Sequence, residues 1–419
     1  SDEWDKYTLC EAMHAHLENK AVGPLVLINV LDPATHKAAE AGTANLTPEN
    51  GRVTIANAGD IILDTVAVTG KTKGTDYTVQ YDFKKKLLTI AEITSGGLGT
   101  EALTITYNSI DATAIDADDV IGATDGAGLN TGLFAIKNVY QETGFIPSFL
   151  LAPGFSSIPA VHSAMIQNSQ KVNSHWDVYV MADIPIVDDE GEQITLATAA
   201  TWKNANGYNK SNETVYFPLV KGTDDKIYHL SVLAAANFQE LLVAQDGIPY
   251  KTASNTECAI ISNLYMGEDS AGRVFDDYLI NNQLNKNGIA SAAYVGGRWA
   301  VWGCHSADFS QEGSDQINVS ETNRMMLYYI SNDFQHRRTR NVIKTIVAEE
   351  QTRLDALVKI GALTYGVVHL NAEPDARSDI MNGDYSFTFN VTTTPLAKSL
   401  TAIVNWTDEG FVTYFADVA

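Results

Sequence analysis

The histidine pair His14-x-His16 and the acidic run 188–192 (DDEGE) hold the residue types that could bind a metal ion. Both histidines fall in a predicted helix over 7–19, where residues two apart point about 200° apart around the axis. The two imidazoles therefore cannot share an ion, and a surface or packing role is favoured. The acidic run lacks the spacing of a calcium-binding loop, which favours a solvated turn over the alternative of a weak divalent-cation site. No metal site is predicted.

Motifs for cofactor binding and nucleophilic catalysis are also missing. The sequence contains neither G-x-x-x-x-G-K-[ST] nor a G-x-G-x-x-G that follows a strand, so no cofactor is predicted. The segment 153–157 (PGFSS) lies between a predicted strand and helix, but it does not match the nucleophile elbow G-x-S-x-G. Ser157 in this segment is interpreted as a helix N-cap. Cys10, Cys258 and Cys304 are widely spaced and are interpreted as reduced thiols. No catalytic residue is predicted, and the chain is not expected to be an enzyme.

Composition limits the class of protein further. The chain has 419 residues, 45% of them hydrophobic, which is enough for two or three domains with full cores. Its net charge of -23 disfavours nucleic acid and anionic membrane surfaces as general partners. No apolar run approaches the roughly 20 residues needed to cross a bilayer, so no direct membrane insertion is expected. The acidic start of the sequence does not resemble a signal peptide, and we expect the protein to fold inside a cell.

A change in the pattern of apolar and polar residues along the chain predicts the domain organisation. Over 36–117, short stretches rich in Val, Ile, Thr and Tyr alternate apolar and polar residues between turn signals, which predicts an inserted β-sandwich or barrel. Patterns typical of alternating strands and helices precede and follow this stretch. They predict an α/β main body from 1–35 plus 118–310, with a mixed sheet and flanking helices. The remaining residues, 311–419, predict a small α+β C-terminal domain with a terminal arm.

Individual elements follow from hydrophobic periodicity and from Gly and Pro positions. The run 24–31 (PLVLINVL) is continuously apolar, which predicts a strand buried on both faces. Gly296-Gly297 predicts a tight hairpin turn. Near the C-terminus, strands over 384–392 and 399–406 are expected to form a small sheet. The other main predictions are strands at 145–154, 177–185 and 213–220, and helices at 131–144, 157–173, 195–205, 232–244 and 275–286.

Four phrases of the sequence, in order, resemble the contractile phage tail sheath family. They are LVLINVLDPATHKAA (25–39), TGLFAIKNVYQETGFIPSFLLAPGFSS (131–157), GIASAAYVGGRWAVWGCHSA (288–307), and the C-terminal pair LDALVKIGAL and DIMNGDYSFTF (354–363 and 379–389). The inserted β-domain lies where the family carries a variable insertion. The family usually has an extended strand before the position that matches Trp4–Cys10, and this chain starts almost at that position.

The resemblance implies a structural subunit that polymerises into stacked rings around an inner tail tube protein and contracts to drive it through a cell envelope. The other implied partners are baseplate and tail terminator proteins, and the implied location is the virion tail, assembled in the bacterial host cytoplasm. Family members link neighbouring subunits by strand addition. The candidate C-terminal arm comprises Phe411, Val412, Thr413, Tyr414 and Phe415.

A local reversal of charge around 336–340 (HRRTR) marks a candidate contact in this acidic chain. Arg337, Arg338, Arg340 and Lys344 are predicted to face an acidic surface of the tube or of an adjacent subunit, with a solvated helix junction as the alternative. Two other function classes stay open at this point. One is a carbohydrate-binding or adhesion module that uses the β-insertion, and the other is an α/β enzyme of unknown substrate.

Overall fold

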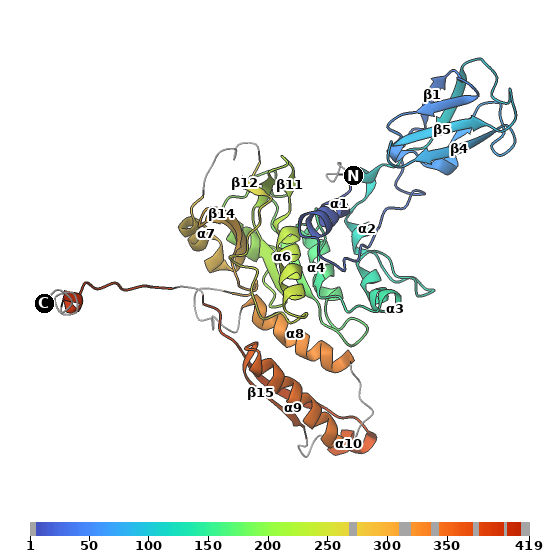
Figure 1. The fold of residues 1–419 in the computed structure, drawn as a ribbon. Coiled ribbons are helices and arrows are strands. Elements are labelled where there is room, and N and C mark those ends of the chain that lie inside the picture. The colour runs from blue at the N-terminus through green and yellow to red at the C-terminus, as the bar shows by residue number, and fades with distance from the viewer. Residues whose placement is uncertain are drawn as a thin grey trace. The chain divides into compact units, whose positions relative to one another are not determined.

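The computed structural model describes residues 6–267, 275–309, 320–336, 343–371, 377–397 and 400–411. The chain divides into two compact units, Ser1–Arg338 and Thr339–Ala419, each considered by itself. Several sheets and helices share the first unit, so the predicted mixed α/β class is confirmed (Figure 1). None of the helices in these ranges is long and apolar enough to span a membrane.

The main sheet of the first unit has five strands in the order β14-β13-β9-β8-β7. Its first four strands along the chain run parallel, and β14 closes a hairpin with β13. All five residues of β8 are buried, as expected for a strand covered on both faces. Gly296 and Gly297 both have positive φ, as the predicted tight turn requires. The strand bounds are β7 (Phe149–Leu150), β8 (Tyr179–Asp183), β9 (Glu213–Tyr216), β13 (Ile289–Val295) and β14 (Arg298–Trp302).

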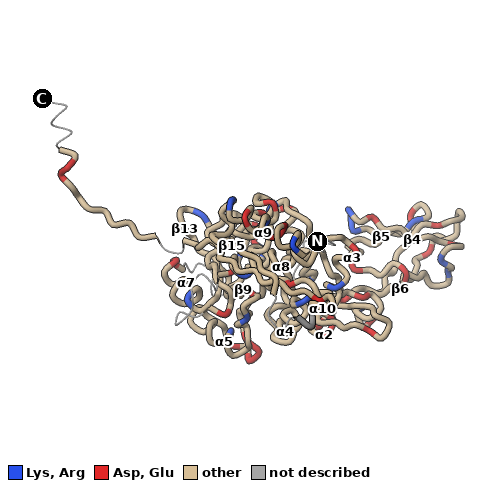
Figure 2. Tube along the Cα trace, turned by 90° about the horizontal axis from the view of Figure 1, so that it is seen from below, with Lys and Arg blue, Asp and Glu red and all other residues tan. Residues whose placement is uncertain are grey.

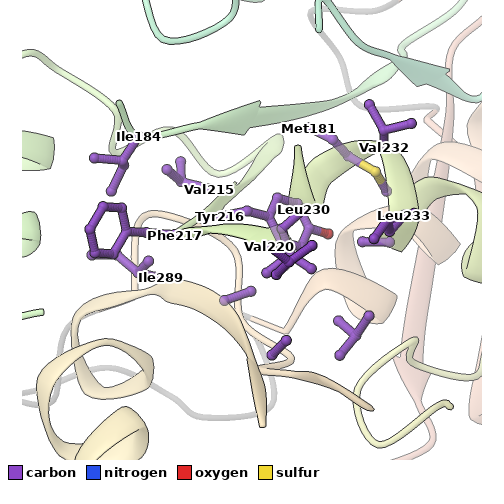
Figure 3. Packing of buried hydrophobic residues seen from close by; sticks show 14 of the residues in the cluster. Met181, Ile184, Val215, Tyr216, Phe217, Val220, Leu230, Val232, Leu233 and Ile289 are labelled. Carbon is purple, nitrogen blue, oxygen red and sulfur yellow. The ribbon is translucent and has the colours of Figure 1, made fainter. Parts of the chain in front are cut away.

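Helix α6 (Leu230–Ala244) forms the centre of the core because its first turns are apolar on every side. It packs against β8 and β9, while α4 (Pro159–Asn168) packs against β8. Figure 3 shows side chains of β8, β9 and α6 in one cluster, including Met181, Val215 and Leu233. The other helices of the body are α2 (Ala117–Ile121), α3 (Val139–Thr143), α5 (Ala199–Ala205) and α7 (Asp277–Gln283).

Pro218 separates the predicted single strand 213–220 into two strands of different sheets. Proline cannot donate to a sheet ladder, so β9 ends before it and the chain begins a second sheet after it. This second sheet has the order β11-β10-β12. Its strands are β10 (Leu219–Gly222), β11 (Ile227–Tyr228) and β12 (Ile261–Tyr265).

The predicted strand over 24–31 is wrong. The N-terminal helix, α1 (Leu9–Met13) followed by a π-helical segment (His14–Asn19), ends before Gly23–Pro24, and the apolar run that follows is extended but pairs with no described strand. Val26 and Leu27 are 43% and 38% exposed. Continuous apolarity correctly indicated an extended segment, but it cannot specify which sheet edge that segment joins.

Residues 42–107 contain six antiparallel strands in two three-stranded sheets, ordered β1-β6-β3 and β2-β5-β4. Alternate residues of these strands enclose a separate small core that includes Leu88, Ile90 and Ile105. The strands are β1 (Gly42–Leu46), β2 (Arg52–Ile55), β3 (Ala67–Val68), β4 (Tyr77–Asp82), β5 (Leu87–Glu92) and β6 (Leu103–Tyr107).

Helix α8 (Glu321–His336) belongs to the first unit, so the second compact unit begins at Thr339 and not at 311 as predicted. Met325 of α8 lies in the main core cluster. Asn332 is hydrogen-bonded to the backbone of Asp177 in both directions, with its Nδ2 donating to the carbonyl oxygen at 2.7 Å. The amphipathic pattern of α8 matches that of the next helix, and periodicity alone does not show against which core a helix packs.

In the second unit, α9 (Ile343–Lys359) packs on the antiparallel pair β15 (Leu363–Leu370) and β16 (Phe387–Thr393), with α10 (Arg377–Asn382) between the strands in sequence. Gly361 has φ +80° just after α9, a conformation that glycine adopts readily at the end of a helix. The partner of β16 is β15, and residues 400–406 form no strand, so the predicted pairing of 384–392 with 399–406 is wrong.

Candidate assembly surfaces

A buried cluster of polar side chains at the end of β8 holds an acid and two serines, the residue types that a catalytic centre could use. Asp183 accepts hydrogen bonds from the amide and the hydroxyl of Ser231, the amide bond being 3.0 Å long, and from the Ser156 hydroxyl at 3.3 Å. All three side chains are at most 2% exposed. Burial raises the pKa of Asp183, against the opposing effects of His229 and the serine donors. With no solvent access, the cluster fits a cap on the first turn of α6 and not a nucleophile.

A second buried pair ties the N-terminal helix to the same end of α6. Glu11 is 2% exposed and accepts hydrogen bonds from the backbone amide and from Nδ1 of His229, the latter at 2.8 Å. Burial by itself would lower the pKa of His229, but the Glu11 carboxylate outweighs it and raises that pKa to about 9. The pair is therefore an ion pair at neutral pH that anchors α1 to the body.

An apolar groove of about 1280 Å³ lies beside this anchor. The extended segment 25–31, the segment 145–150 that leads into and includes β7, and the C-terminal half of α6 line it, and Phe145 and Val243 are 52% and 63% exposed at its rim. The apolar run 25–31 is evident in the sequence, but nothing in the sequence indicates that it lies at the surface. Within the described ranges, no group of three His, Cys, Asp or Glu side chains is placed to hold a metal ion.

The second unit exposes apolar residues on an extended segment. All residues from 400 to 411 are exposed, among them Leu400 at 90%, Val404 at 90% and Trp406 at 80%. Residues 400–406 adopt neither helix nor strand. Exposed apolar residues in such a run are typical of a segment that a partner covers, because exposing contiguous apolar surface to water is unfavourable in free energy.

The residues predicted for contacts are only partly placed by the structure. Lys344 is exposed in the first turn of α9, whereas Arg337, Arg338 and Arg340 lie outside the described residues. Phe411 is 54% exposed, and the rest of the candidate arm, Val412 to Phe415, also lies outside them. Three of the four residues of the predicted basic cluster thus lie outside the described residues, and the role of the cluster stays a prediction. With the exposed segment 400–411 included, the candidate arm begins at residue 400 and not at 411.

Comparison with solved structures shows which known proteins share this fold. The chain is similar to the sheath complex of an extracellular contractile injection system, PVC, in the contracted state, with 14% identity, a TM-score of 0.50, and coverage of 67% of this chain and 75% of that one. A chain of the anti-feeding prophage baseplate in the contracted state is similar to the same degree, with 14% identity, a TM-score of 0.50, and coverage of 66% and 77%. These matches establish a shared fold.

Among curated proteins, the chain is similar to the tail sheath protein of Burkholderia phage BcepMu, with 27% identity over 317 residues and 72% of this chain covered. The chain spans 63% of the length of that relative. No family model matches the sequence. The predicted resemblance to contractile tail sheath proteins is confirmed by these comparisons.

Proposed function

We propose that this chain is the structural subunit of a contractile tail sheath, which polymerises around an inner tube and contracts to drive the tube through a target envelope. The observation that carries the proposal is the exposed apolar segment 400–411 in a unit whose described sheet has two strands. A two-stranded sheet is marginal alone, and an extended segment from another subunit can complete it by main-chain hydrogen bonds.

The partners of the proposed subunit are further copies of itself, the inner tail tube protein, and baseplate and tail terminator proteins. We place it in the virion tail or a related injection particle, assembled in the bacterial host cytoplasm. We propose that it carries out no chemical reaction. The domain layout we propose is an α/β body interrupted by the β-domain at 36–117, followed by a C-terminal assembly domain.

Electron microscopy of the purified full-length chain tests the proposal directly. Tubular polymers or stacked rings are expected. A variant that lacks residues 400–419 should stay folded and soluble, because the described residues that it loses, 400–411, are exposed and none belongs to the main core. The same variant should form no tubes. Normal tubes from that variant would show that the arm is dispensable. Only dispersed monomers from the full-length chain, at any concentration and salt, would overturn the sheath assignment.

A further inference from the structure

A rigid basic turn projects from the β-domain between β4 and β5. Phe83 is 82% exposed there and is followed by three exposed lysines, Lys84, Lys85 and Lys86. Asp82 Oδ1 accepts the amides of Lys84 at 3.0 Å and Lys85 at 3.1 Å, which fixes the turn. Acidic and basic positions are scattered along the chain in Figure 2, and the sequence has a single run of three adjacent lysines among 28 basic and 51 acidic residues.

The side chains of this basic turn are poised for an external partner. The Phe83 ring packs edge-to-face on Tyr81, with 4.8 Å between ring centroids, which orders an aromatic group that is still open to solvent. Lys85 has an ion pair with Asp82 at 4.0 Å, and no ion pair of Lys84 or Lys86 occurs within the described ranges. Because the Phe83 ring is already ordered, it loses little conformational entropy on binding, and the charges of Lys84 and Lys86 are available to a partner.

An acidic turn of complementary character lies in the main body at 187–193. Asp188 Oδ1 accepts the amides of Glu190 at 3.0 Å and Glu192 at 2.8 Å, so this turn is also fixed by an aspartate. Val187 is 45% exposed at its base. The three remaining carboxylates, of Asp189, Glu190 and Glu192, are exposed and form no ion pair with a described lysine or arginine.

We propose that the basic turn 83–86 of one copy docks on the acidic turn 187–193 of a second copy of this chain. Three lysines would face three carboxylates, and Phe83 would cover Val187. A contact between two different patches of identical subunits is heterologous, and such contacts generate rings or helical arrays. In a chain of net charge -23, the contact also offsets the repulsion between neighbouring copies. The inference rests on the proposed function for its partner, a neighbouring subunit.

Photo-crosslinking locates the contact. The full-length chain with p-benzoylphenylalanine in place of Phe83 is mixed as nitrogen-14 and nitrogen-15 forms, irradiated, digested and sequenced by mass spectrometry. Crosslinks that join the two isotopic forms and end within 186–194 are expected. Crosslinks that end elsewhere, or none at concentrations where tubes form, would overturn the docking while leaving the sheath assignment intact. Crosslinked dimers at 186–194 without any tubes would support the docking and count against the sheath.

Charge exchange tests the electrostatic part. The variant K84E/K85E/K86E should need a roughly tenfold or higher concentration to associate, because three weak ion pairs become three repulsions. Adding D189K/E190K/E192K should restore association and returns the net charge to -23. Melting temperatures of all variants are measured to confirm that each one is folded.

A matched control separates the local contact from net charge. The variant K210E/K251E/K359E changes three exposed lysines elsewhere, and combined with D189K/E190K/E192K it also has a net charge of -23. This combination should not associate like the original chain. If it does, or if K84E/K85E/K86E associates normally and instead loses retention on lipopolysaccharide vesicles, the turn binds no second copy and the proposal fails.

Discussion

In the first unit, five strands share one sheet with helices packed on it, whereas the described sheet of the second unit has two strands and is covered by one helix. The first unit buries its polar groups in pairs such as Glu11 with His229, and its core residues are almost fully buried. The second unit leaves an apolar run, 400–411, in solvent. The first unit thus has a large buried core of its own, while the described part of the second unit leaves an extended apolar segment uncovered.

The largest expected effect is that a substitution in the core of the first unit lowers stability, whereas substitutions in the exposed segment 400–411 abolish assembly. Leu233→Ala, in the buried centre of α6, should lower the free energy of unfolding by about 2–5 kcal/mol. The double variant Ile403→Asp and Trp406→Asp should leave the melting temperature unchanged and abolish tubes, because both side chains are about four-fifths exposed in the single chain. Calorimetry and electron microscopy of the same samples provide the comparison. A lowered melting temperature in the double variant would show that the arm contributes to the fold.

A buried carboxyl at the start of α8 should make the first unit sensitive to pH. Burial raises the pKa of Glu321 to about 8, opposed by a hydrogen bond from Thr252. A folded-state pKa above the unfolded value of 4.5 means that its favourable contribution is complete below pH 4.5 and is lost as pH rises toward 8. Glu321→Gln should therefore stabilise the unit by up to about 3 kcal/mol at pH 7 and by little at pH 4. Equal effects at both pH values would contradict the buried neutral carboxyl.

The anchor between α1 and α6 should give a pH dependence in a higher window. The pKa of His229 is raised from 6.5 to about 9, so its contribution is complete below pH 6.5 and is lost as pH rises through 9. The stability difference between the original chain and His229→Gln should shrink by about 3 kcal/mol from pH 6.5 to pH 10. Denaturant titrations at several pH values measure it, and a constant difference would show that Glu11 does not hold the charged histidine.

The same contrast explains which features the sequence could predict. Strand β8 and the Gly296-Gly297 turn depend on local signals within a few residues, and the structure has them where the sequence predicts them. The run 24–31 and the segment 399–406 have strand-like composition, but a strand needs a partner edge, and their composition does not name one. The sequence places helix α8 in the wrong unit for a similar reason, because its apolar face does not specify which core it joins. The groove likewise depends on contacts between distant segments.

The smallest expected effect concerns the basic residues next to the second unit. We expect Arg337, Arg338, Arg340 and Lys344 to contact an acidic surface of the tube or of an adjacent subunit, and Lys344 is exposed in the described part of that region. Each exposed ion pair should contribute only about 0.2–1 kcal/mol, and repetition over many subunits makes the sum large. Weak individual contacts suit a surface that contraction must release.

Salt and charge reversal distinguish this contact from an ordinary solvated surface. Because screening at about 0.15 M ionic strength already acts over about 8 Å, extended sheaths should become less stable as salt rises. Reversing all four basic residues should impair assembly on the tube or favour the contracted form, with no change in the melting temperature of the subunit. A matched control reverses four exposed lysines of the first unit, Lys37, Lys73, Lys210 and Lys251. If both variants assemble alike across a range of salt, net charge and not the position of the cluster governs assembly, and the cluster is a solvated helix junction.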